Sequence, residues 1–157
     1  MLFRSTDEGA GDLVAENDAL GLALAAEHAA VWGYGVVGAA LATADRGTAT
    51  AAEAAHRDVR DSVLTVLSER SVEPAPAEGG YALPFPVLSP VDAAALAVVL
   101  EDGTAAAWVR VLDQAAGRGT RTLAVEALTG AEVRAVGWRT AAGQTPVTRA
   151  LPGLPPA

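Results

Sequence analysis

The longest apolar stretch of the chain lies between Asp18 and Arg46. Alanine and leucine dominate it, and both residues favour helices. Apolar residues recur there at three- and four-residue spacing, which predicts one face of a long helix, and others lie on the remaining faces, so neighbouring helices should cover it on most sides. The apolar face comprises Leu20, Leu24, Val31, Tyr34, Gly38 and Leu41.

The same stretch has nearly the length of a membrane span, which needs about 20 apolar residues with few or no charges. Glu27 and His28 interrupt it, and much of the rest is alanine. We therefore expect the core helix of a soluble protein with no membrane partner. Glu27 itself falls on the apolar face, three residues after Leu24 and four before Val31. A carboxylate in that position is the first candidate for a functional side chain.

A second helix is expected from Thr48 or Thr50 to about Ser71. Glu53 follows Thr50 by three residues, which is the spacing of a capping box. Capping is therefore the favoured role of Glu53, ahead of metal ligation. His56 lies in the apolar row of this helix and is the second candidate side chain.

A third helix should begin at Ser89–Pro90, a good N-cap followed by proline at the first helical position, and continue to about Ala116. It carries Glu101 on its apolar face. A fourth helix is expected over residues 120–142. Its predicted apolar face carries Glu132 beside Val125, Leu128 and Val136.

The segment between the second and third helices, residues 72–90, is rich in proline, so no helix is expected there. Its sequence YALPFPV places apolar residues at every second position, and residues before proline prefer extended geometry. About 17 extended residues span ~50 Å, whereas a helix of about 25 residues is only ~38 Å long. The segment can therefore cross the whole length of a bundle, which makes the second and third helices parallel.

These elements predict three regions. Residues 1–16 are expected to form a flexible lead-in, residues 17–142 a four-helix bundle, and residues 143–157 an extended tail docked through Leu151 and Leu154. The fold class is therefore all-α.

Composition narrows the function classes. The chain has 157 residues, of which 51% are hydrophobic, enough for one folded domain. Its formal net charge of −8 offers no basic surface for nucleic acid. It contains no cysteine, which excludes disulfides and cysteine nucleophiles and fits a cytoplasmic location. A homodimer is expected only because bundles of this size often pair.

Several stretches resemble a bacterial ferritin-like domain family of unknown function. They are AEHAAVWGYGVVGA, HRDVRD, YALPFPV, Leu100–Glu101, Trp138–Arg139 and the closing LPGLP, and the resemblance covers about residues 17–155. It implies a ferritin-like four-helix bundle with one long crossover. It implies no substrate.

Ferritin-like dimetal proteins take one Glu from each of two helices and a Glu-x-x-His motif from each of the other two. The chain offers Glu27, Glu53 with His56, Glu101 and Glu132, but Ala135 stands where the last histidine would be. The set is therefore one ligand short.

Depth along the bundle argues further against a metal. With the first turn near Arg46, Glu27 lies ~29 Å before the turn and His56 lies ~15 Å after it, a difference of ~14 Å. We therefore predict that Glu27, His56, Glu101 and Glu132 are buried polar groups satisfied by other side chains, among which Arg60, Arg110, Arg134, Tyr34 and Tyr81 are available.

The sequence thus favours a non-catalytic structural or interaction module without a cofactor, and no enzymatic activity is expected. The alternative is a metal-binding protein of the iron or manganese oxidase or storage type that uses Glu53, His56, Glu101 and Glu132. A third reading is a small-molecule binder that uses a gap between large tryptophan and small alanine residues.

Overall fold

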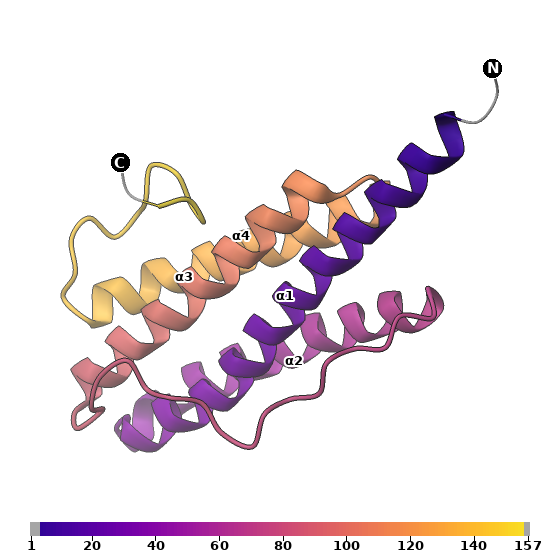
Figure 1. Ribbon diagram of the computed structural model, residues 1–157. Coiled ribbons are helices and arrows are strands. Elements are labelled where there is room, and N and C mark those ends of the chain that lie inside the picture. Colours follow the sequence, from indigo (N-terminus) through magenta and orange to yellow (C-terminus); the bar gives the residue numbers. More distant parts are fainter. Residues whose placement is uncertain (1–3, 156–157) are drawn as a thin grey trace.

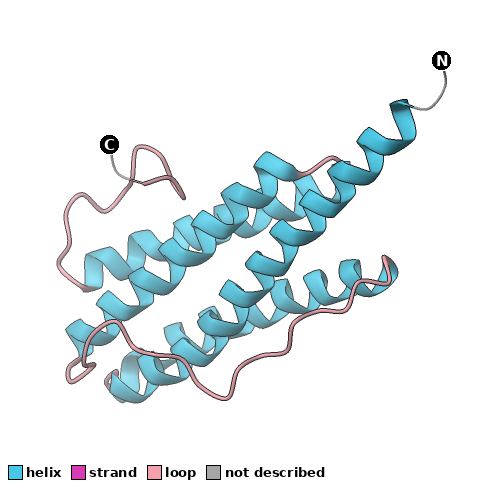
Figure 2. Cartoon of the chain, viewed as in Figure 1, coloured by secondary structure: helices cyan, strands magenta, loops and turns pink. Residues whose placement is uncertain are grey.

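The structure is a computed structural model that describes the backbone of residues 4–155 and the side chains of residues 12–155. The chain forms an all-α four-helix bundle with a long loop between the second and third helices (Figures 1 and 2). The helices are α1 (Arg4–Ala40), α2 (Arg46–Glu69), α3 (Pro90–Gln114) and α4 (Arg118–Ala141), with a short 3-10 turn η1 (Thr43–Asp45) before α2.

The helices pack as a sequence of neighbours rather than as a closed square. α1 packs against both α2 and α3, and α3 packs against α4. Within the described part of the chain, the backbones of α2 and α4 do not approach each other in this way. The loop after α2 returns along the bundle, so α2 and α3 run in the same direction, as the proline-rich segment predicts (Figure 1).

Both ends of α1 differ from the prediction. The helix already begins at Arg4, so residues 4–16 are helical rather than a flexible lead-in, because no proline interrupts them; residues 1–3 lie outside the described part. At the other end α1 stops at Ala40, and the chain turns through η1. Gly47, expected to end α1, instead lies in the first turn of α2.

The helix starts of α2 and α3 test two capping predictions. The Ser89 side chain accepts the backbone N–H of Asp92 at 3.1 Å, so the predicted N-cap of α3 is confirmed. The predicted capping box of α2 is wrong, because the helix begins at Arg46. Glu53 instead accepts a hydrogen bond from Arg57 Nε, four residues later, at 3.1 Å.

The apolar core has two parts. One lies towards the α1–α2 turn and includes Tyr34, Leu96 and Trp138. The other lies towards the opposite end of the bundle and includes Leu24 and Trp108. Between these two parts, every helix contributes a polar side chain, and the candidate site is built from that layer.

The buried face of α4 differs from the predicted one. Val125, placed on the apolar face by the sequence pattern, is 52% exposed, and Glu132 is only half-buried. The side chains that are buried are mostly small, which lets α4 lie close to α3. The buried row is Thr120, Ala124, Ala127, Ala131, Ala135 and Trp138.

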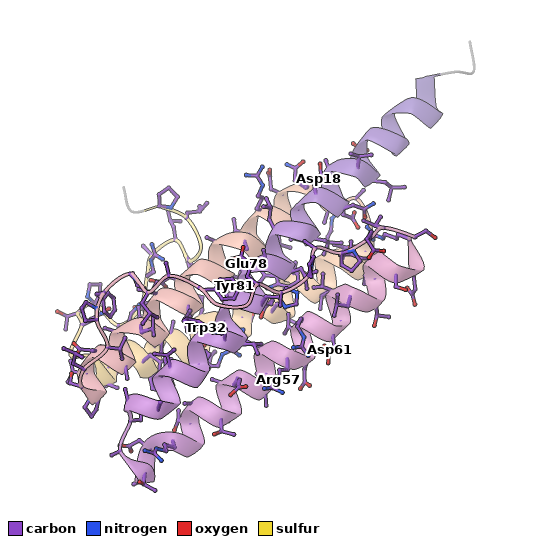
Figure 3. The ribbon with its side chains drawn as sticks, turned by 60° about the horizontal axis from the view of Figure 1, so that its bottom comes forward. Asp18, Trp32, Arg57, Asp61, Glu78 and Tyr81 are labelled. Atoms are coloured by element: carbon purple, nitrogen blue, oxygen red, sulfur yellow. The ribbon has the colours of Figure 1, made fainter. Side chains whose placement is uncertain are left out.

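The crossover lies along α1. Tyr81 meets Trp32 of α1 with ring centroids 5.7 Å apart, and both are labelled in Figure 3. Phe85 and Val87 pack against the core near the α1–α2 turn. Leu83 is 39% exposed, so the predicted apolar edge holds only in part.

The tail after α4 docks on α3 through backbone rather than through leucines. Gly153 has φ +73°, and a Cβ there would lie 2.7 Å from the Ala105 carbonyl oxygen, so only glycine fits. Leu151 and Leu154 are 58% and 43% exposed, so docking through these two side chains is wrong. Arg139 of α4 donates to the Val147 carbonyl at 3.1 Å and fixes the start of the tail.

Between Asp12 and Ala40, α1 is long and apolar enough to cross a membrane by length and composition alone. Core helices of soluble proteins meet the same criteria.

Two glycines of α1 test how closely α1 and α3 approach. A Cβ on Gly33 would lie 2.7 Å from Leu100 Cδ1, whereas a Cβ on Gly35 would meet nothing within 4 Å. We expect Gly33→Leu to lower the free energy of unfolding by about 1–3 kcal/mol through overpacking. The control Gly35→Leu should raise it by up to about 1 kcal/mol through helix propensity. Urea denaturation measures both, and equal effects would contradict this packing.

Candidate functional site

His56 of α2 lies at the centre of the polar layer and is 1% exposed. Its Nδ1 is 2.6 Å from Glu27 Oε2 on α1, and its Nε2 is 3.3 Å from Glu101 Oε1 on α3. One imidazole therefore bridges two carboxylates from two other helices. Glu27 and Glu101 are themselves 1% and 0% exposed.

Two aromatic side chains complete the hydrogen bonding of the carboxylates. Trp108 Nε1 donates to Glu27 Oε1 at 2.7 Å. The Tyr34 hydroxyl donates to Glu101 Oε1, and its ring stacks on the imidazole of His56 with centroids 5.4 Å apart. Each oxygen of Glu27 thus lies within hydrogen-bond distance of a ring nitrogen, one from Trp108 and one from His56.

The fourth helix contributes Arg134. Its Nε donates to Glu101 Oε1 at 2.8 Å and its Nη2 to Glu101 Oε2 at 3.0 Å, a two-pronged contact typical of guanidinium with carboxylate. Nη2 also lies 3.4 Å from His56 Nε2. Glu101 is therefore held between two basic groups.

These contacts set the protonation states. Burial alone would lower the pKa of His56, but its hydrogen bonds to Glu101 and Glu27 raise the pKa above its ordinary value. Burial would raise the pKa of Glu101, but His56 and Arg134 lower it. Burial and the Glu101 charge raise the pKa of Tyr34, so the phenol stays neutral. The layer thus brings two basic side chains, His56 and Arg134, into contact with two carboxyl groups, those of Glu27 and Glu101.

The arrangement leaves little capacity for metal binding. A metal needs an imidazole lone pair, and both ring nitrogens of His56 face carboxylate oxygens at hydrogen-bond distance. Arg134 also occupies both oxygens of Glu101. Over the described residues, no group of three or more histidine, aspartate or glutamate side chains has an arrangement that could hold a metal ion.

The predicted ~14 Å stagger between Glu27 and His56 is wrong. It assumed a first turn near Arg46, whereas α1 ends at Ala40 and α2 already begins at Arg46. Glu27 is therefore 13 residues from the end of α1, or ~20 Å, and His56 is 10 residues into α2, or ~15 Å. The five-residue connection between the two helices accommodates the remaining difference in height along the bundle, so the two side chains lie in contact.

Two other predicted site residues lie outside the layer. Glu53 pairs with Arg57 on the outer side of α2. Glu132 has one oxygen 3.7 Å from Arg139 Nη1, while its Oε1 is buried without a hydrogen-bond partner among the described residues. Of the predicted set Glu53, His56, Glu101 and Glu132, only His56 and Glu101 come together.

A third buried carboxylate, that of Glu16, was not among the predicted site residues. Glu16 of α1 is 0% exposed and accepts the backbone N–H groups of Ala116 and Gly117 at 2.7 Å and 3.0 Å, at the start of α4. Its other oxygen accepts hydrogen bonds from Arg70 Nη2, at 2.6 Å, and from the Thr120 hydroxyl. The sequence pattern could have identified Glu16, because it precedes Leu20 by four residues and so falls on the same apolar face of the helix.

Glu16 thus joins α1, the end of α2 and the start of α4. Burial alone would raise the pKa of Glu16, but hydrogen bonds from Thr120, the Gly117 amide and Arg70 outweigh it and lower the pKa to about 2. A carboxylate at a helix N-terminus is also favoured by the helix dipole.

Comparisons with known proteins match this chain to proteins without a stated function. A protein-family model described as "Domain of unknown function (DUF4439)" matches residues 19–156. The crystal structure of a conserved hypothetical protein, Rv2844, from Mycobacterium tuberculosis is similar, with 41% sequence identity and a TM-score of 0.79. The match covers 81% of this chain and 96% of that chain. A search of curated proteins gave no match.

Arg134 gives a direct test of the charge balance. Arg134→Met leaves the buried carboxylate of Glu101 without its guanidinium, so we expect the free energy of unfolding to fall by about 3–5 kcal/mol. Arg110 is exposed on α3 and has no ion pair among the described residues, so Arg110→Met should change it by less than about 0.5 kcal/mol. Similar losses in the two variants would refute the role of Arg134.

Glu16 predicts an acid-dependent contribution to stability. Because the pKa of Glu16 is lowered on folding, its contribution is complete above the ordinary pKa of about 4.5 and is lost as the pH falls towards 2. Glu16→Gln should therefore lower the free energy of unfolding by about 2–3 kcal/mol at pH 7, and by less at pH 3. Chemical denaturation at both pH values measures this.

The exposed Glu126 on α4 supplies the control. Glu126→Gln should leave stability nearly unchanged at both pH values. A loss in Glu16→Gln that does not shrink in acid would show that the carboxylate charge is not the source.

Proposed function

Since the chain belongs to the DUF4439 family of domains of unknown function, we propose from its own residues that it is a non-catalytic structural or interaction module. In this proposal the chain is a ferritin-like bundle whose central layer holds an ion network instead of a dimetal centre. The observation that carries it is the placement of the Arg134 guanidinium across Glu101, beside the imidazole of His56.

The helix order supports the ferritin-like part of the proposal. Such bundles have one long crossover, and their metal ligands project inward from all four helices. Here the crossover joins α2 to α3, and the inward polar groups are Glu27 of α1, His56 of α2, Glu101 of α3 and Arg134 of α4. The position of the layer agrees with a dimetal centre, and its chemistry does not.

The chemistry of the layer supports a role without a metal. Dimetal sites need several carboxylates that can bridge two cations, but here a guanidinium already neutralises Glu101. A cation placed beside Arg134 would be repelled by it, and the repulsion is strong where water is excluded. The network satisfies its own charges and needs no ion.

A metal-binding protein of the iron or manganese type is the second candidate, favoured by one observation. Three ligand-type side chains, Glu27, His56 and Glu101, meet in one layer from three helices. To coordinate a metal, Arg134 would have to leave Glu101, and His56 would have to lose a proton and turn a ring nitrogen away from a carboxylate. These changes make this function the weaker candidate.

Elemental analysis separates the two functions. Protein purified without a histidine tag, from medium that contains iron, manganese and zinc, is expected to hold only substoichiometric metal. Addition of EDTA should leave its melting temperature unchanged, because a ligand that binds only the folded state would otherwise stabilise it.

His28 provides the matched control, since it neighbours Glu27 in sequence but lies outside the network. Stoichiometric metal that is lost in His56→Asn and retained in His28→Asn would establish the metal-binding function and overturn the proposed one.

A further inference from the structure

A cavity of about 860 Å³ opens between α2 and α4, on the side of the bundle where the backbones of these two helices do not pack together. It lies at the end of the bundle that carries the α1–α2 turn and the start of α3. Cavities of roughly 300–1,000 Å³ are typical of small-molecule sites. None of the roles described above uses this space.

The walls of the cavity are mostly apolar, and small residues keep them apart. Gly47 and Ala51 line the cavity from α2, and Gly137 and Ala141 line it from α4. A Cβ on Gly137 would meet nothing within 4 Å, so this glycine leaves open space. The indole of Trp138 supplies one large apolar surface. The cavity therefore suits a ligand with an apolar body.

The rim of the cavity is also apolar. Val91 and Val133 belong to its lining and are 57% and 68% exposed. A ligand bound here would cover both side chains, and the removal of apolar surface from water would drive its binding.

Among the described residues, only Arg134 and Asp45 bring a charge to the cavity wall. The charge of Arg134 is already compensated, because its guanidinium binds the buried carboxylate of Glu101 through two nitrogens. Arg134 therefore gives the cavity no preference for an anion.

Asp45 is the charged group of the wall that lacks a partner. It is exposed, directly precedes α2 and accepts no hydrogen bond from the N–H groups of that helix. Within the described part of the chain it forms no ion pair, and the neighbouring Arg46 instead donates from Nε to the Leu41 carbonyl at 3.3 Å. The net charge of −8 adds to the attraction of Asp45 for a cation.

We propose that this cavity binds a small hydrophobic amine, with its ammonium group against Asp45 and its apolar body between α2 and α4. The proposal rests on the interaction role given above and deepens it by naming a ligand class. A metal found by elemental analysis would overturn the metal-free role alone, whereas the binding measurements below test only the cavity, so the two can fail separately.

The exposure of Asp45 limits the selectivity. A solvent-exposed ion pair changes a binding constant by no more than about fivefold, so apolar contact sets the affinity and Asp45 sets the order among ligands of equal apolar length. Added salt should weaken this order, because it screens exposed charges.

The three tryptophans of the chain give a reporter and two internal controls. Trp138 lines the cavity, whereas Trp108 lies in the other part of the core and Trp32 contacts Tyr81 of the crossover. The test is a fluorine-19 NMR titration of the EDTA-treated full chain labelled with 5-fluorotryptophan. Octylamine should shift the signal of Trp138 and leave the other two signals in place.

Charge selection is measured with octylamine, octanoate and octan-1-ol, which share one alkyl chain. At low ionic strength octylamine should bind at least about fivefold more tightly than octanoate, because Asp45 attracts the first and repels the second. Asp45→Asn should weaken octylamine binding about two- to fivefold and leave octan-1-ol binding unchanged. The control Asp58→Asn removes an exposed acid of α2 outside the cavity lining and should change neither.

Two further variants test the position of the site. Gly137→Leu fills the cavity and should weaken octylamine and octan-1-ol binding alike, at least about tenfold, because the new side chain occupies the space of the apolar body. Gly35→Leu makes the same change on an open face of α1 and should leave binding unchanged.

Three results would overturn the proposal. Octanoate binding as tightly as octylamine, or octylamine binding unaffected by Asp45→Asn, would show that Asp45 does not select the ligand. Binding unaffected by Gly137→Leu would place the site elsewhere. An unmoved Trp138 signal with all three probes would show that the cavity takes no ligand of this kind.

Discussion

A carboxylate removed from water must receive hydrogen bonds and an opposite charge, because an unpaired buried ion costs several kcal/mol. Glu27 and Glu101 place two such groups in the middle of this bundle, and the other helices supply their partners. His56 bridges the two acids, and Arg134 binds the second. The hydrogen bonds of this layer form together only when all four helices are in register. They therefore fix the relative positions of the helices more tightly than contacts between small alanine side chains alone would.

The same constraint recurs at the far end of the bundle. Glu16 is buried and receives Arg70 from the end of α2, Thr120 from α4 and two backbone N–H groups that precede α4. The two polar layers lie on either side of the core that contains Trp108. The side between α2 and α4, which lacks close backbone packing, is spanned by Arg70 at one end and by Arg134 in the middle.

The sequence predicts the helices and their direction well, because prolines stop the second helix and Ser89–Pro90 starts the third. It also predicts that Glu27, His56 and Glu101 face inward, because each interrupts an apolar row. It does not predict that they meet, since a shift of a few residues in the turn moves a side chain by ~1.5 Å per residue. Nor does it identify Arg134, among several arginines, as the partner of Glu101. The arginine side chain is long, so the carboxylate that it reaches depends on how the helices pack.

The protonation of His56 tests the central claim most directly. Nitrogen-15 NMR of the imidazole distinguishes a protonated ring from either neutral tautomer, without any substitution in the core. A charge-balanced network predicts that both ring nitrogens carry a proton at pH 6, because each faces a carboxylate and these contacts raise the pKa of His56 above its ordinary value. A neutral imidazole at pH 6, with one nitrogen unprotonated, would contradict the account and return His56 to the set of available metal ligands.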